Sequence, residues 1–128
     1  MIKVQKAAEG KLKQQVGNGR NQIFSDEPVD VGGDDQGFAP FDLLDAALGS
    51  CTALTVTMVA RRKQMPLTDV RVEITHDNAD GVHHLHRQIE LVGDLTGEQR
   101  TYLLGIANKC PVHRALSGKI EIDTALKS

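Results

Sequence analysis

This chain has few aromatic residues, only two cysteines and no large excess of positive or negative charge. Of its 128 residues, three are Phe, one is Tyr and none is Trp, so a hydrophobic core has to be built from aliphatic side chains. The 15 Lys and Arg residues nearly balance the 17 Asp and Glu residues, which leaves a net charge of −2. This balance offers no basic surface for nucleic acid. The length fits one domain, and we expect a single domain over residues 1–128.

A secretory signal peptide is also missing, because the N-terminal segment is polar. The one long apolar run, residues 38–64, contains Asp42 and Asp45 together with Gly, Ser and Thr residues. Carboxylates are costly inside a membrane-spanning helix. We therefore expect a cytoplasmic protein with no membrane-embedded segment.

Residues 38–64 are the stretch around which the chain is organised, and they predict one long helix. Pro40 suits the first turn, where a missing N–H costs nothing, and Pro66 disfavours continuation of the helix. Apolar residues cover more than one stripe, which is typical of a buried helix. Cys51 lies in the middle of this helix.

Alternating and capping patterns predict the other elements. Glycine-separated segments before the long helix indicate strands, and a solvent-facing, flexible loop follows them. The expected elements are three strands over residues 2–7, 11–16 and 20–25, a loop over 26–37, an antiparallel hairpin over 70–92 with a turn at 77–81, a helix that begins at Thr96, a short helix after Cys110, and a last strand around Ile120 and Ile122. Strands grouped in hairpins with separate helices indicate the α+β class.

The long helix has more apolar surface than the predicted strands can cover. One sheet covers one side of a helix, and the other side needs a partner. The same helix in a second copy of the chain is the simplest partner, so we expect a symmetric homodimer. The alternative is that the short helices of the same chain cover it.

The two cysteines, Cys51 and Cys110, are the first candidates for chemistry. A thiolate that attacks a peroxide becomes a sulfenic acid, and a second thiol can condense with it. Two inert buried thiols are the alternative. The apolar helix face around Cys51 raises a thiol pKa, whereas Cys110 precedes Pro111 at a predicted helix start, which lowers it. The residues alone therefore predict that Cys110 is the more acidic thiol.

Three histidines, His83, His84 and His86, lie close together in the predicted hairpin. His84 and His86 share a strand face and can chelate a metal, but a third ligand is not apparent. We interpret these histidines as solvent-facing, and we predict no metal site and no cofactor.

Two segments that contain the cysteines resemble the motifs of the OsmC/Ohr family. They are residues 40–53, PFDLLDAALGSCTA, and residues 109–114, KCPVHR. The Asp26-Glu27-Pro28 segment, followed by two glycines, is similar to a loop of the OsmC-like branch. The resemblance runs from about residue 20 to residue 124.

This resemblance implies antiparallel sheets around a long buried central helix, in an intertwined homodimer with active sites at the subunit interface. It also implies a thiol-dependent peroxidase that reduces organic hydroperoxides in oxidative-stress defence. Cys51 would be the attacking thiol and Cys110 the resolving thiol, and an external dithiol would regenerate them.

Members of the family place an arginine and a glutamate around the attacking thiol. Arg20, the only arginine among residues 1–60, is the candidate for the first. The glutamate position holds Phe41, and Asp42 follows it; on a helix Asp42 is too far from Cys51 and reaches only the site of a second subunit. This departure favours the OsmC-like branch. The alternative function is an OsmC-like stress-response or ligand-binding homodimer with little peroxidase activity.

Overall fold

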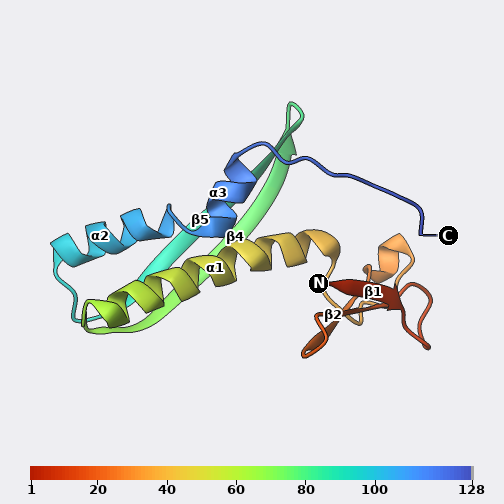
Figure 1. The fold of residues 1–128 in the computed structure, drawn as a ribbon, viewed down its shortest axis with the longest axis horizontal. Coiled ribbons are helices and arrows are strands. Elements are labelled where there is room, and N and C mark those ends of the chain that lie inside the picture. The colour runs from red at the N-terminus through yellow and green to blue at the C-terminus, as the bar shows by residue number, and fades with distance from the viewer. Residues whose placement is uncertain (128) are drawn as a thin grey trace. The chain divides into compact units, whose positions relative to one another are not determined.

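The computed structural model describes residues 1–127 and has the α+β class, the antiparallel sheets and the long helix that the sequence predicts. Contacts divide these residues into two units, residues 1–44 and residues from 45 onward. The elements are β1 (Lys3–Lys6), β2 (Gln14–Gly17), β3 (Gln22–Ser25), the 3-10 helix η1 (Val29–Val31), α1 (Pro40–Arg62), β4 (Leu67–Ala79), β5 (Val82–Gly93), α2 (Gly97–Ala107) and α3 (Pro111–Ser117), and Figure 1 shows their course.

The first unit contains a three-stranded antiparallel sheet in the order β1-β2-β3. All three predicted strands are present. The second begins later than predicted because the Ala7 N–H donates to the Lys13 carbonyl and closes the connection before it. The β2–β3 turn is held by Asn18, whose Oδ1 accepts from the backbone N–H groups of Arg20 and Asn21.

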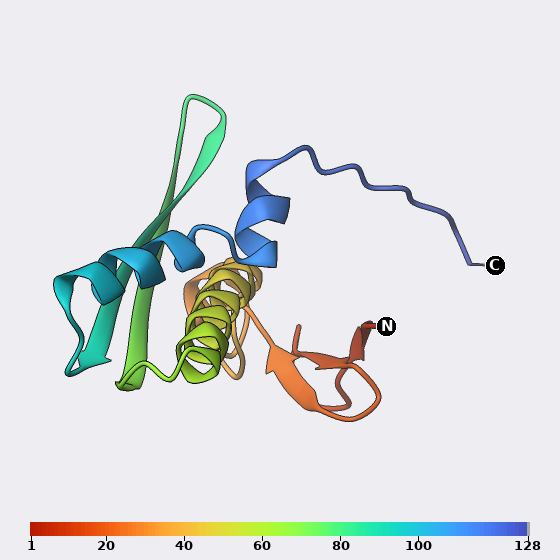
Figure 2. The same ribbon diagram turned by 60° about the vertical axis from the view of Figure 1, so that its left-hand side comes forward.

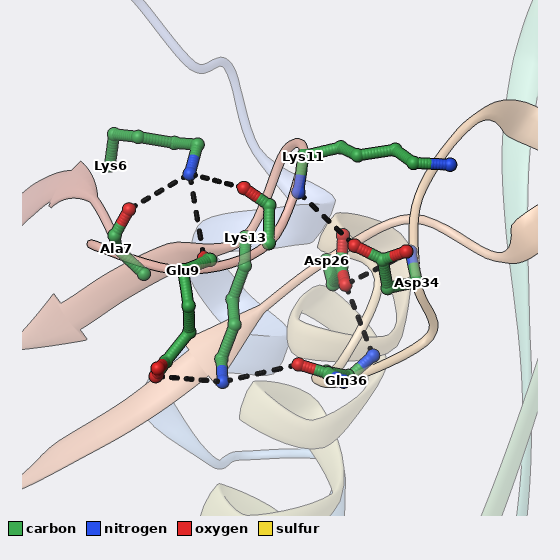
Figure 3. A network of polar contacts seen from close by, with 9 residues as sticks. Lys6, Ala7, Glu9, Lys11, Lys13, Asp26, Asp34 and Gln36 are labelled. Carbon is green, nitrogen blue, oxygen red and sulfur yellow. Dashed lines mark hydrogen bonds and ion pairs between the residues drawn. The ribbon is translucent and has the colours of Figure 1, made fainter.

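A buried carboxylate organises the loop after β3 (Figure 3). Asp26 is 4% exposed; its Oδ1 accepts from the Glu27 N–H at 2.8 Å, and its Oδ2 accepts from the N–H groups of Asp34 and Gln36 at 3.3 and 3.1 Å. Burial raises the pKa of Asp26, but these three N–H groups and the charge of Lys13 outweigh burial and lower that pKa. The loop, which we expected to be flexible and solvent-facing, is therefore fixed at its base by a stabilised charge.

Helix α1 buries a single stripe within this chain, made by every fourth residue: Leu48, Thr52, Val56 and Ala60. Leu54 and Met58 on another face are 61% and 58% exposed. Within a single chain, one hairpin and one short helix cover one side of α1, and the side that carries Leu54 and Met58 is the one for which we expect a second copy as partner. By length and composition alone this helix also resembles a membrane span. Its most apolar 18-residue segment has a mean hydropathy of 1.6, and 22% of that segment is buried within the chain.

The second unit packs α1 and α2 on one face of the β4–β5 hairpin. The hairpin is antiparallel, as predicted, and its two-residue turn is Asp80-Gly81, where both residues have positive φ. The apolar core comprises Val56, Ala60, Leu95, Leu103 and Ala107, with Val70, Ile89 and Leu91 from the hairpin packed against it. The predicted capping box is present, since Thr96 and Gln99 exchange hydrogen bonds at 2.9 and 3.1 Å.

The predicted last strand is wrong for this chain. Residues 118–127 form no strand, and Ile120 and Ile122 are 59% and 83% exposed. Figure 2 shows this segment as an extended stretch after α3. Alternation of apolar and charged residues makes a strand possible, but a strand also requires an edge to pair with, and within the described residues this segment has none.

Candidate active site

The two cysteines, remote in sequence, come together where α1 lies next to the start of α3. Cys51 is half-buried on α1, and Cys110 is fully buried at the N-cap of α3. Both are free thiols, and the Cys110 side chain is near enough to the Cys51 sulfur to lower the pKa of Cys51. The two sulfurs therefore lie near each other, although they are 59 positions apart in the sequence.

Three hydrogen bonds tune the Cys51 thiol. Burial raises the pKa of Cys51, but hydrogen bonds from the Val112 backbone, the Cys110 side chain and the Thr55 side chain outweigh burial. The result is a pKa below the ordinary value for cysteine, which favours the reactive thiolate. Thr55 lies one turn along α1, with its Oγ1 3.9 Å from the sulfur.

Backbone groups at the start of α3 lie next to both thiols. Pro111 occupies the first turn, which confirms the predicted helix start, and the His113 N–H donates to Cys110 Sγ at 3.3 Å. The backbone of the neighbouring residue, Val112, acts on Cys51 instead and lowers the pKa of that thiol. The helix-start effect that we assigned to Cys110 therefore also reaches Cys51, which the sequence did not indicate.

Thr52 can accept a hydrogen bond from the Cys110 thiol but cannot donate one to it. Its hydroxyl donates to the Leu48 carbonyl at 2.7 Å, so its single proton is already used. Thr52 Oγ1 lies 3.9 Å from Cys110 Sγ and can only accept there. The Cys110 S–H thus has two acceptors available, Thr52 Oγ1 and the Cys51 sulfur.

Sequence reasoning missed Arg87, which supports this pair of thiols. Its guanidinium donates to Thr52 Oγ1 at 3.0 Å, to Asn108 Oδ1 at 2.8 Å and to His113 Nδ1 at 3.1 Å. Through these hydrogen bonds, this one side chain of β5 links the hairpin to α1, to the end of α2 and to α3. The sequence did offer one indication of this role. Arg87 is the charged residue on the strand face that otherwise carries the apolar side chains of Leu85, Ile89 and Leu91 on β5.

Cys51 opens onto an apolar hollow of about 550 Å³. Leu54, Met58 and Val59 of α1 and Val112 of α3 form much of its wall, with Arg62 at one end. A hollow of this composition accepts the hydrocarbon part of a ligand and excludes water from it. The Cys51 sulfur thus faces an apolar surface.

The other two predicted site residues belong to the first unit. Arg20 is exposed in the β2–β3 turn, where its backbone N–H donates to Asn18 Oδ1 at 2.9 Å. Asp42 is exposed in the first turn of α1, where its Oδ2 accepts from the Ala39 N–H at 3.3 Å. Their roles at the thiol remain predictions.

The lowered pKa predicts the pH dependence of alkylation. The Cys51 thiolate should reach half its maximal reactivity with iodoacetamide at a lower pH than an ordinary cysteine thiol does, because three hydrogen bonds favour the charged form. Peptide-resolved mass spectrometry measures Cys51 separately from Cys110. Thr55→Val, which removes one hydrogen bond and keeps the shape, should move the midpoint upward. A midpoint at or above the ordinary value in the unaltered chain would contradict the assignment.

The sequence matches the model of a known protein family, and the fold matches known structures. The model of the OsmC-like protein family matches residues 33–125. A structure from Psychrobacter arcticus 273-4, named for osmotic stress induction and a detoxification response, is 25% identical with a TM-score of 0.75 over 89% of this chain and 85% of that one. No curated protein sequence matches the chain.

Two further structures are named for organic hydroperoxide resistance. One is the OsmC protein of Legionella pneumophila, 19% identical with a TM-score of 0.65 over 92% of this chain and 88% of that one. The other is OhrB of Bacillus subtilis, 20% identical with a TM-score of 0.58 over 92% of this chain and 91% of that one. At these identities the likeness is one of fold.

Proposed function

Because the chain belongs to the OsmC-like protein family, we propose that it is a thiol-dependent peroxidase that reduces organic hydroperoxides in oxidative-stress defence. The contact between Cys51 and Cys110 is the observation that carries this proposal. A catalytic cycle of this kind needs an acidic attacking thiol and a second thiol within reach. The apolar hollow at Cys51 suits a hydroperoxide with a hydrocarbon group.

In the first step, the Cys51 thiolate attacks the terminal oxygen of the hydroperoxide. A sulfur–oxygen bond forms and the oxygen–oxygen bond breaks, so the sulfur is oxidised to a sulfenic acid and the substrate is reduced to its alcohol. The alkoxide that leaves takes up one proton from water. The amide of Val112 and the hydroxyl of Thr55 stabilise the thiolate before the attack.

In the second step, Cys110 attacks the sulfenic sulfur of Cys51. A disulfide forms, and the sulfenic oxygen leaves as water with the proton of the Cys110 thiol. Thr52 Oγ1 can only accept from that thiol, so it donates no hydrogen bond that would make the Cys110 sulfur a weaker nucleophile. Arg87 acts as a positioning residue, because it keeps Thr52 and the start of α3 in place.

Regeneration requires an external dithiol that reduces the disulfide by exchange. Two free thiols persist in a reducing compartment, and we therefore propose the cytoplasm as the location. We also propose that residues 1–128 act as one OsmC-like domain within a homodimer whose active sites lie at the subunit interface. In that arrangement Arg20 and Asp42 are the candidates to complete the site of a second copy.

The proposal is tested by one equivalent of cumene hydroperoxide added to the reduced chain. We expect mass spectrometry of the alkylated, digested product to show a Cys51–Cys110 disulfide and one equivalent of alcohol. The alternative is a stress-response or ligand-binding homodimer with little peroxidase activity, which Phe41 at the expected glutamate position favours. Two unchanged thiols together with unconsumed hydroperoxide would support that alternative.

A further inference from the structure

A second group of reactive side chains lies at the hairpin, apart from the two thiols. Asp45 comes from α1, His76 from β4 and His83 from β5, and one ligand atom from each lies within 4.8 Å of the others. His76 and His83 belong to the hairpin face that also carries Leu85. Their rings lie 5.2 Å apart between centroids. The fold thus brings three residues from three elements to one point.

The carboxylate and the imidazoles are held in orientations that direct ligand atoms inward. Asp45 Oδ2 lies 2.6 Å from His76 Nδ1. His83 Nδ1 lies 3.4 Å from Asn78 Oδ1, and its Nε2 is buried. A partner on one ring nitrogen fixes the orientation of the ring and directs the other nitrogen, as in natural metal sites.

The second oxygen of Asp45 is a separate indication of a ligand. Asp45 Oδ1 is buried and has no hydrogen-bond partner among the described residues. An ionised oxygen buried without a donor is costly, and such atoms in native proteins point to a water or an ion. A cation at this cluster would satisfy that oxygen and balance the negative charge of the carboxylate.

We propose that Asp45, His76 and His83 form a binding site for a divalent first-row transition metal, with Zn²⁺ as the expected ion. Two imidazoles and one carboxylate suit Zn²⁺ and related ions, whereas Mg²⁺ and Ca²⁺ prefer oxygen ligands alone. Ligand atoms on a tetrahedral Zn²⁺ with bonds of about 2 Å lie roughly 3.3 Å apart. The present separations bracket that value, so small rotations of the side chains suffice.

The site has a route to solvent. His83 lines a hollow of about 330 Å³ together with Leu48, Leu85 and Arg87. The charge of Arg87 is held by Thr52, Asn108 and His113. Three protein ligands and an accessible hollow leave the remaining coordination position to water. This inference is independent of the proposed peroxidase function.

The test is a titration of the untagged, metal-free full chain with zinc chloride, followed by isothermal calorimetry. We expect one Zn²⁺ per chain, with affinity reduced at least about tenfold in Asp45→Asn and in His83→Gln, since each removes a ligand. Asn preserves the size of Asp45, and circular dichroism in the presence of EDTA shows whether either variant retains its fold. The Co²⁺-loaded chain should lack the charge-transfer band that a thiolate ligand produces.

The matched control is the double variant His84→Gln/His86→Gln. These two rings stack on the opposite face of the hairpin, 6.2 Å apart between centroids, and His86 pairs with Asp77 at 2.8 Å. This variant should keep the full affinity. Loss of binding in the control, full binding in both folded ligand variants, or no stoichiometric binding by the unaltered chain would each overturn the proposal.

Discussion

Replacement of Cys51 by serine is expected to reduce the rate of hydroperoxide consumption to that of the buffer. A serine hydroxyl stays protonated at neutral pH, so the hydrogen bonds that lower the pKa of the Cys51 thiol have no anion to stabilise. Loss of a nucleophile removes the covalent pathway, and a decrease in kcat/KM of at least about a thousandfold follows. A coupled assay with an organic hydroperoxide and a dithiol measures the rate.

Cys110→Ser is the matched control, because it removes the second thiol and keeps the first. Without a reductant, this variant should still consume one equivalent of hydroperoxide per chain and stop, with Cys51 one oxygen atom heavier. The double variant should consume none. Undiminished turnover by Cys51→Ser would eliminate the mechanism, and an inert Cys110→Ser would transfer the attacking role to Cys110, as the sequence alone suggested.

Local patterns explain why much of the fold was predictable. The capping box at Thr96 and the two-residue turn at Asp80-Gly81 depend on neighbouring residues, and the hairpin follows from period-two alternation. The expected strand around Ile120 and Ile122 failed for the opposite reason. Its formation depends on a partner edge, and no property of its own residues indicates where that edge lies.

The candidate site was predictable only where a motif carries it. Cys51 and Cys110 came from two motifs, but the donation from Val112 to Cys51 depends on how α3 packs against α1. Arg87 was missed because its partners come from three other elements. Asp45 and His76 are 2.6 Å apart only in the folded chain. The sequence therefore pointed to His84 and His86 as a metal-binding pair and not to the Asp45–His76–His83 cluster proposed above.

The exposed face of α1 gives the second large expected effect, a loss of dimerisation in Leu54→Asp. Leu54 and Met58 are 61% and 58% exposed in the isolated chain, and Leu54 borders hollows on both of its sides. Monomeric proteins rarely leave such continuous apolar surface uncovered. A second copy of the same helix would cover it with an identical surface, as a two-fold interface requires.

The size of this effect follows from the two-fold symmetry, because each substitution acts twice. Burial of one leucine contributes about 2 kcal/mol, so two contribute about 4 kcal/mol, which corresponds to roughly a thousandfold in the dimer dissociation constant. Sedimentation equilibrium of the reduced chain measures that constant. The matched control is Leu104→Asp on α2, where the leucine is 52% exposed and distant from this face in sequence. We expect Leu104→Asp to remain a dimer; an unaltered chain that sediments as a monomer, or a Leu54→Asp dimer as tight as the control, would refute the pairing of the central helices.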